Sequence, residues 1–125
     1  MTTRYRSRFE FDFATYLDNN NIRFEYEPRK IKYVPKEKSY TPDFYLVDYD
    51  MFIETKGRFI EADRTKHKLI AKQHPDIDIR FMFQNPRVKL SKKSKATYAD
   101  WCEKNDFLYC TKELPYTWVK KNEHK

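Results

Sequence analysis

Two carboxylates and one lysine lie close together in residues 40–57, YTPDFYLVDYDMFIETKG. Asp43 follows a proline, and one residue separates Glu54 from Lys56. Alternate side chains of an extended strand point to the same face, so Glu54 and Lys56 would share a face. Two carboxylates can hold Mg²⁺ together with a substrate phosphate, and a neighbouring ammonium can stabilise the charge that develops on the phosphate. These residues therefore indicate a site for phosphodiester hydrolysis.

The position of Asp43 depends on the turn that joins its strand to the strand of Glu54. A two-residue turn would place Asp43 opposite Lys56 and diagonal to Glu54, whereas a four-residue loop at residues 47–50 would place it directly opposite Glu54. A three-residue loop would send it to the other face, because a shift of one residue reverses every side chain. Two of the three turns thus bring the charged groups together.

A chain with 36% charged residues is also expected to contain such a pattern by chance. The apolar neighbours favour the functional interpretation, because an exposed strand does not need them. They predict that the charged groups lie at the margin of a core, where an isolated charge is costly unless it is paired or bound to a metal. These neighbours are Phe44, Leu46, Met51, Phe52 and Ile53.

The composition favours a single basic domain over residues 1–125. The chain is 39% hydrophobic and 18% aromatic, which is enough for a core. The net charge of +7 points to a polyanionic partner, and nucleic acid is favoured over a membrane because no apolar amphipathic run accompanies the charge. A merely soluble basic protein would have the same charge. The expected contacts to nucleic acid are Arg4, Arg6, Arg64, Lys66, His67, Lys68, Arg87, Lys89, Lys92, Lys93 and Lys95.

The N-terminus and the cysteines indicate a cytoplasmic protein that is not secreted. The N-terminal run MTTRYRSR contains no apolar core, so we expect no signal peptide, and no stretch is apolar enough to span a membrane. Cys102 and Cys110 fit a reducing compartment, and they lack the spacing of a zinc site.

The apolar spacing predicts the elements that surround the charged residues. A helix over residues 7–19 would begin at Ser7, with Glu10 either a capping residue or a further carboxylate of the site. A helix at 62–73 between strands at 51–56 and 77–83 is typical of a βαβ unit with parallel strands. Further expected elements are strands at 22–26, 30–34 and 108–110, a polar connection at 35–39, a helix at 97–105 and a buried segment at 114–119.

The chain resembles the phage endonuclease I family, which resolves Holliday junctions and belongs to the PD-(D/E)XK nuclease superfamily. The resemblance covers nearly the whole chain from Arg4 onward. It implies an α/β fold, a mixed sheet flanked by helices with a restriction-endonuclease-like core, and a metal-dependent enzyme that hydrolyses branched DNA in the host cell. It rests on the runs RSRFE, IRFEYE, YTPDF, IETKG, KHKLIAKQHPDIDIRFMF and WCEK, and on a tail with proline and tryptophan.

The resemblance also implies roles for particular residues. The family's catalytic site corresponds to Glu10, Asp43, Glu54 and Lys56. The metal, Mg²⁺ or Mn²⁺ in its place, would be held by Asp43, Glu54 and the Thr55 carbonyl, with Glu10 as a further candidate. Family members are intertwined homodimers. This implies an exchanged bridge at residues 33–40 and a Glu10 supplied by the partner subunit.

Two departures from the family are visible. The interval from Asp43 to Glu54 is about one residue longer, which would need a rebuilt turn or a β-bulge. Both termini, which help to grip branched DNA in the family, are shorter. Two alternatives stay open: a homing or nicking endonuclease of the same fold that cuts a specific duplex sequence, and a DNA-binding module without catalysis.

Overall fold

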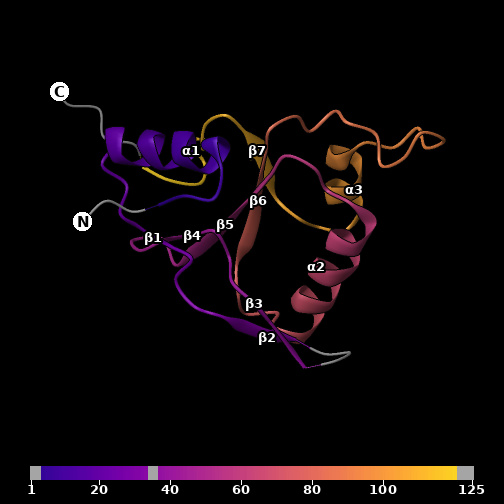
Figure 1. Ribbon diagram of the computed structural model, residues 1–125, viewed down its shortest axis with the longest axis horizontal. Helices are drawn as coiled ribbons and strands as arrows, with labels where there is room; N and C mark the ends of the chain where they lie inside the picture. Colours follow the sequence, from indigo (N-terminus) through magenta and orange to yellow (C-terminus); the bar gives the residue numbers. More distant parts are fainter. Residues whose placement is uncertain (1–3, 34–36, 121–125) are drawn as a thin grey trace.

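The computed structural model describes residues 4–33 and 37–120. A five-stranded sheet, in the order β1-β4-β5-β6-β7, lies at its centre, and β2 pairs with β3 in a separate two-stranded sheet (Figure 1). The strands β1, β4 and β5 are antiparallel neighbours, whereas β5, β6 and β7 are parallel. The elements are α1 (Arg8–Asn19), β1 (Phe24–Tyr26), β2 (Ile31–Tyr33), β3 (Lys38–Tyr40), β4 (Phe44–Leu46), β5 (Met51–Lys56), α2 (Glu61–Gln73), β6 (Ile79–Phe83), α3 (Tyr98–Lys104) and β7 (Tyr109–Thr111).

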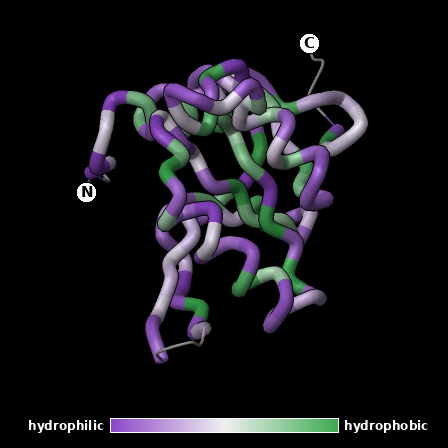
Figure 2. The backbone as a smooth tube through the Cα atoms, turned by 90° about the vertical axis from the view of Figure 1, so that its right-hand side faces the viewer, coloured by the Kyte–Doolittle hydropathy of each residue, from purple (hydrophilic) through white to green (hydrophobic). Residues whose placement is uncertain are grey.

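Helices flank this mixed sheet, which confirms the predicted α/β fold. Phe13 and Leu17 of α1 pack with Met82 of β6 in one apolar cluster. Phe81 and Phe83 alternate with Met82 and belong to a second cluster, which includes residues of α3. Figure 2 shows green, hydrophobic stretches of the backbone inside the molecule and purple, hydrophilic stretches along much of its outside.

The hairpin of β4 and β5 settles the position of Asp43. Phe44 pairs with Ile53 and Leu46 with Met51, so residues 47–50 form a four-residue loop. The pairing is continuous from Phe44 to Leu46, so no β-bulge interrupts this hairpin. Asp50 has φ 50°, a left-handed conformation that aspartate tolerates better than most residues. The four-residue alternative is therefore confirmed.

The predicted βαβ unit is also confirmed. The strands β5 and β6 are parallel, with α2 between them in the chain. The helix begins at Glu61, one residue earlier than expected, and β6 begins at Ile79, two residues later than expected. The Lys56 carbonyl accepts a hydrogen bond from the Gln84 N–H at 2.9 Å, which ties the ends of the two strands together.

Capping residues fix the first and last helices as predicted. The Ser7 side chain accepts a hydrogen bond from the Glu10 N–H at 3.1 Å and begins α1. Asn21 has φ 56°, so an asparagine supplies the left-handed residue after the helix. Thr97 and Asp100 form a complete capping box at the start of α3.

The expected polar connection at residues 35–39 is wrong in part. Lys38 and Ser39 belong to β3, which pairs with β2. The physical reason is the burial of Tyr40 with Ile31 and Ile70, which fixes the register of this hairpin although its other residues are polar. Residues 34–36, at the centre of the predicted exchange bridge, lie outside the described part of the chain.

The remaining elements are close to their predicted positions. The strand expected at 22–26 is confined to Phe24–Tyr26, and the strand expected at 108–110 lies at Tyr109–Thr111. Leu114 and Val119 are buried in the first apolar cluster, which confirms that the C-terminal segment packs on the core. Among the described helices, none is long and apolar enough to cross a membrane.

Candidate active site

Asp43, Glu54 and Lys56 lie together, as predicted. Asp43 immediately precedes β4, and the other two residues lie on β5. The Asp43 N–H donates to Glu54 Oε1 at 3.3 Å, and Lys56 Nζ lies 3.6 Å from Glu54 Oε2. Asp43 and Glu54 are only 3% and 6% exposed. Glu54 and Lys56 line a cleft of about 380 Å³, so one buried acid and an ammonium face the same hollow, and Asp43 lies next to Glu54.

Thr55 holds the carboxylate of Asp43 in place. Asp43 Oδ2 accepts hydrogen bonds from the Thr55 N–H at 2.9 Å and from the Thr55 hydroxyl at 2.7 Å. Burial, followed by the negative charge of Glu54, raises the pKa of Asp43 to about 8. The Thr55 hydroxyl thus orients Asp43, a contact that the sequence did not indicate. The role of the Thr55 carbonyl as a metal ligand stays a prediction.

Tyr40 holds the carboxylate of Glu54. The Tyr40 hydroxyl donates to Glu54 Oε1 at 2.6 Å, and both side chains are buried. Burial raises the pKa of Glu54, while the positive charge of Lys56 acts in the opposite direction. Tyr40 was not predicted as a site residue, because no periodic pattern marks a hydroxyl that will meet an acid on another strand.

Asp63 of α2 provides a second partner for the lysine. Lys56 Nζ lies 3.4 Å from Asp63 Oδ2, and Lys66 Nζ lies 4.0 Å from Asp63 Oδ1. The ammonium of Lys56 is therefore held between Glu54 and Asp63. Acids are common near a helix N-terminus, so the sequence gives no separate signal that Asp63 lies close to the site.

Glu10 reaches the same cluster from α1 in the same chain. Glu10 Oε1 accepts hydrogen bonds from the Tyr26 hydroxyl at 2.5 Å and from the Arg6 N–H at 3.2 Å. Arg6 Nη2 lies 3.8 Å from Glu10 Oε2 and 3.2 Å from Asp43 Oδ1. The carboxylate of Glu10 thus lies with Arg6 at the acidic cluster, and its backbone N–H donates to Ser7 in the helix cap.

Glu27 is a further acid that the sequence analysis did not identify. Its N–H donates to the Asp43 carbonyl at 2.8 Å, and its φ is 49°. Glu27 Oε2 forms an ion pair with Arg6 Nε at 2.6 Å, although this contact is too bent for a hydrogen bond. No spacing in the sequence indicates that the acid directly after β1 will meet the residue before β4.

The expected nucleic-acid contacts fall into three groups. His67 is 1% exposed, so its expected contact with phosphate is corrected; its ring packs edge-on against Tyr40 and Phe81, and burial lowers its pKa. Arg64 and Lys66 are half-buried, and Lys66 lines the cleft. The exposed residues are Arg4, Arg6, Lys68, Arg87, Lys89, Lys92, Lys93 and Lys95.

The carboxylates suit a hard divalent cation. Among the described residues, no three acidic, histidine or cysteine side chains are already gathered as a metal-binding group. Asp43 and Glu54 nevertheless provide the right donors, because Mg²⁺ prefers carboxylate oxygens and needs only one or two when water and phosphate complete its shell. Both acids are buried and already attract cationic side chains, so the donor set fits Mg²⁺.

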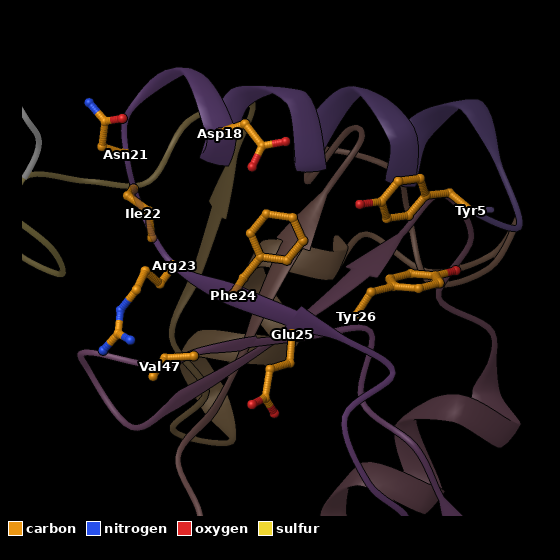
Figure 3. Close-up of a pocket in the computed structure, with 9 residues that line it drawn as sticks. All are labelled: Tyr5, Asp18, Asn21, Ile22, Arg23, Phe24, Glu25, Tyr26 and Val47. Atoms are coloured by element: carbon orange, nitrogen blue, oxygen red, sulfur yellow. The ribbon is translucent and has the colours of Figure 1, made fainter. Parts of the chain in front are cut away.

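A larger hollow lies elsewhere in the described structure. It measures about 820 Å³ and is situated between α1 and β1, with Tyr5 and Tyr26 at one end and Arg23 and Val47 at the other (Figure 3). Tyr26 lines this hollow, and its hydroxyl also contacts Glu10 of the acidic cluster. Size alone therefore does not identify the site in this molecule.

A mixed sheet that places two buried acids and a lysine together beside one cleft defines a candidate phosphodiesterase. The sequence model for phage endonuclease I matches residues 1–125. Endonuclease I of Escherichia phage T7 is 42% identical over 118 residues, which cover 93% of this chain and 78% of the relative. Endodeoxyribonuclease 1 of Enterobacteria phage T3 is 44% identical over 118 residues, which cover 93% and 77%. The chain belongs to the phage endonuclease I family, which confirms the predicted class of enzyme.

Proposed function

We propose that the protein is a metal-dependent DNA endonuclease that resolves four-way and other branched DNA by paired cuts, within the host cell. The observation that carries this proposal is the buried pair of Asp43 and Glu54 beside Lys56. The names of the T7 and T3 relatives support an endonuclease, and the T3 relative is named as acting on DNA. Selectivity for branched DNA follows from the family resemblance.

Asp43 and Glu54 would hold Mg²⁺, or Mn²⁺ in its place, with the Thr55 carbonyl and Glu10 as further candidate ligands. The bound ion would supply a more acidic water and a Lewis acid for the phosphate. Lys56 would stabilise the negative charge that develops on the phosphate, because its ammonium lies in the cleft between Glu54 and Asp63. Thr55 and Tyr40 would keep the two acids oriented.

The basic residues would hold the DNA backbone. Lys66 lines the cleft beside Lys56, and its ammonium lies 5.0 Å from the centre of the Tyr40 ring. Arg64 is less available, because its Nη1 donates to the Phe59 carbonyl at 2.5 Å. The loop that follows β6 presents Arg87, Lys89, Lys92, Lys93 and Lys95 to solvent. Lysine and arginine contacts to phosphate give affinity without sequence preference, as a structure-selective nuclease requires.

Cleavage of a labelled four-way junction beside its matched linear duplex, with Mg²⁺, tests this proposal. We expect paired nicks near the branch and little cutting of the duplex. Cutting at one sequence, with or without a branch, would favour a homing or nicking endonuclease of the same fold. Absence of metal-dependent cutting from both substrates would leave a DNA-binding module.

We also propose that the protein is a homodimer with exchanged elements. Arg6 and Glu27 precede residues 34–36, whereas Asp43 follows them. The Arg6–Asp43 ion pair and the hydrogen bond from the Glu27 N–H to the Asp43 carbonyl join the two parts within one chain. Domain swapping replaces such contacts with the same contacts between subunits. Opening of the β2–β3 hairpin would therefore give composite sites with an unchanged set of residues.

Mixing two inactive variants distinguishes a shared site from a self-contained one. Glu10→Gln and Lys56→Ala proteins should each fail to nick DNA. After the two are refolded together, an exchanged heterodimer has one site with both residues intact, so nicking should return. If each chain completes its own site, both sites of a mixed dimer stay defective, and no nicking would return.

A further inference from the structure

Arg6 places one guanidinium against three carboxylates. Its Nη2 lies 3.2 Å from Asp43 Oδ1 and 3.8 Å from Glu10 Oε2, and its Nε lies 2.6 Å from Glu27 Oε2. A planar guanidinium with five N–H donors can satisfy several acceptors at once. The side chain of Asp43 is 4% exposed, whereas that of Arg6 is 66% exposed. The cation therefore covers a buried acid from the solvent side.

The backbone of Arg6 is held independently of its side chain. The Arg6 N–H donates to Glu10 Oε1 and to the Tyr26 hydroxyl, both at 3.2 Å. The next residue, Ser7, caps α1. Only the side chain of Arg6 would have to move for the guanidinium to leave Asp43. Its closest carboxylate contact is with Glu27, and that contact can be kept during the movement.

We propose that Arg6 occupies the acidic cluster before a divalent ion binds and competes with that ion for Asp43. This inference rests on the proposed metal-dependent function. Two cations within a few ångströms of one another repel, so Asp43 cannot bind both without a cost. Binding of the ion would leave the guanidinium near Glu27, where it can turn to a DNA phosphate and donate two parallel hydrogen bonds.

Two effects of opposite direction follow from this exchange. In the free protein, Arg6 lowers the affinity for the divalent ion. In the complex, the phosphate attracts the guanidinium away from Asp43, so DNA raises the affinity for the ion, and the ion raises the affinity for DNA by the same factor. A purely structural role for Arg6 would predict weaker binding of both ligands when the residue is replaced.

Titration calorimetry of the folded, DNA-free protein with Ca²⁺ as the probe tests the competition. Arg6→Gln should bind Ca²⁺ about tenfold more tightly than the wild type, because a competing charge is removed. Arg8→Gln is the matched control. It removes the same charge two residues away, from an arginine that pairs with the exposed Asp12. Its affinity should change less than about twofold. At saturating Ca²⁺, Arg6→Gln should bind a four-way junction more weakly than the wild type and Arg8→Gln do.

Each outcome of this titration decides something. Equal or weaker Ca²⁺ binding by Arg6→Gln, or an equal gain in Arg8→Gln, would overturn the competition. Loss of folding in Arg6→Gln, monitored by circular dichroism, would transfer the test to Arg6→Lys, which keeps the charge but cannot contact three acids at once, so a smaller gain is expected. If wild type binds no Ca²⁺, or Glu54→Gln binds it equally well, the proposed metal site itself fails.

Discussion

Glu54→Gln should lower the rate of DNA cleavage by about a thousandfold or more and leave DNA affinity within a fewfold of the wild type. The change removes a charge and keeps the shape of the side chain. The amide oxygen can still accept from the Tyr40 hydroxyl and the Asp43 N–H, at the positions where these groups now lie 2.6 Å and 3.3 Å from Glu54 Oε1. The fold is therefore preserved while the site loses an anionic donor.

Single-turnover cleavage and a gel-shift titration of the same junction measure the two quantities. Glu103→Gln is a close control, because Glu103 also accepts a hydrogen bond from a tyrosine, Tyr109, at 2.6 Å, but is exposed on α3. That variant should cleave at the wild-type rate. Equal losses of cleavage and binding in Glu54→Gln would contradict the assignment of Glu54 as a metal ligand.

The acidic cluster should destabilise the metal-free protein at alkaline pH. Burial, with Glu54 nearby, raises the pKa of Asp43 from 3.8 to about 8 in the folded state. Between these values the folded chain retains a proton that the unfolded chain has released. The stability associated with this proton is fully present below the unfolded pKa and is lost as the pH rises through the folded pKa.

Asp43→Asn removes this titration, so the variant should gain stability relative to the wild type as the pH rises. From about pH 5 to about pH 8, in the presence of EDTA, we expect the difference to grow by about 4 kcal/mol, or roughly 15 °C in Tm. Addition of Mg²⁺ should reduce the difference, because the ion stabilises the ionised wild-type acid.

Thermal unfolding at several pH values checks this expectation. Asp48→Asn provides the control, because Arg23 lowers the pKa of the exposed Asp48 and the same trend should be absent. A constant difference between Asp43→Asn and the wild type at every pH would contradict the raised pKa. Asp43→Asn should also be inactive in cleavage, so that stability and activity change in opposite directions.

The sequence predicted those parts of the fold that depend on local patterns. The apolar spacing of α1, the alternation of β5 and β6, and the capping residues Ser7 and Thr97 are all properties of neighbouring residues. The face shared by Glu54 and Lys56 also follows from strand geometry. The loop length stayed open, because turns of two and four residues preserve the same face.

The supporting contacts of the site could not be predicted in the same way. Arg6, Glu27 and Tyr40 reach the acids from segments that no periodicity relates to β5. His67 is different, because a signal was present: it lies three residues before Ile70 and therefore on the same face of α2 as a buried apolar residue. The basic residues on either side of it obscured that signal.

The distances along the chain between contacting residues have a consequence for folding. Arg6 and Asp43 are separated by 37 residues, and Tyr40 and Glu54 by 14. Such non-local contacts form only after the intervening chain has closed, which is a slow part of folding. A nascent chain on the ribosome therefore contains Asp43 and Glu54 before these residues have been brought together in the folded site. The capacity to cut DNA begins with the completed sheet rather than with synthesis.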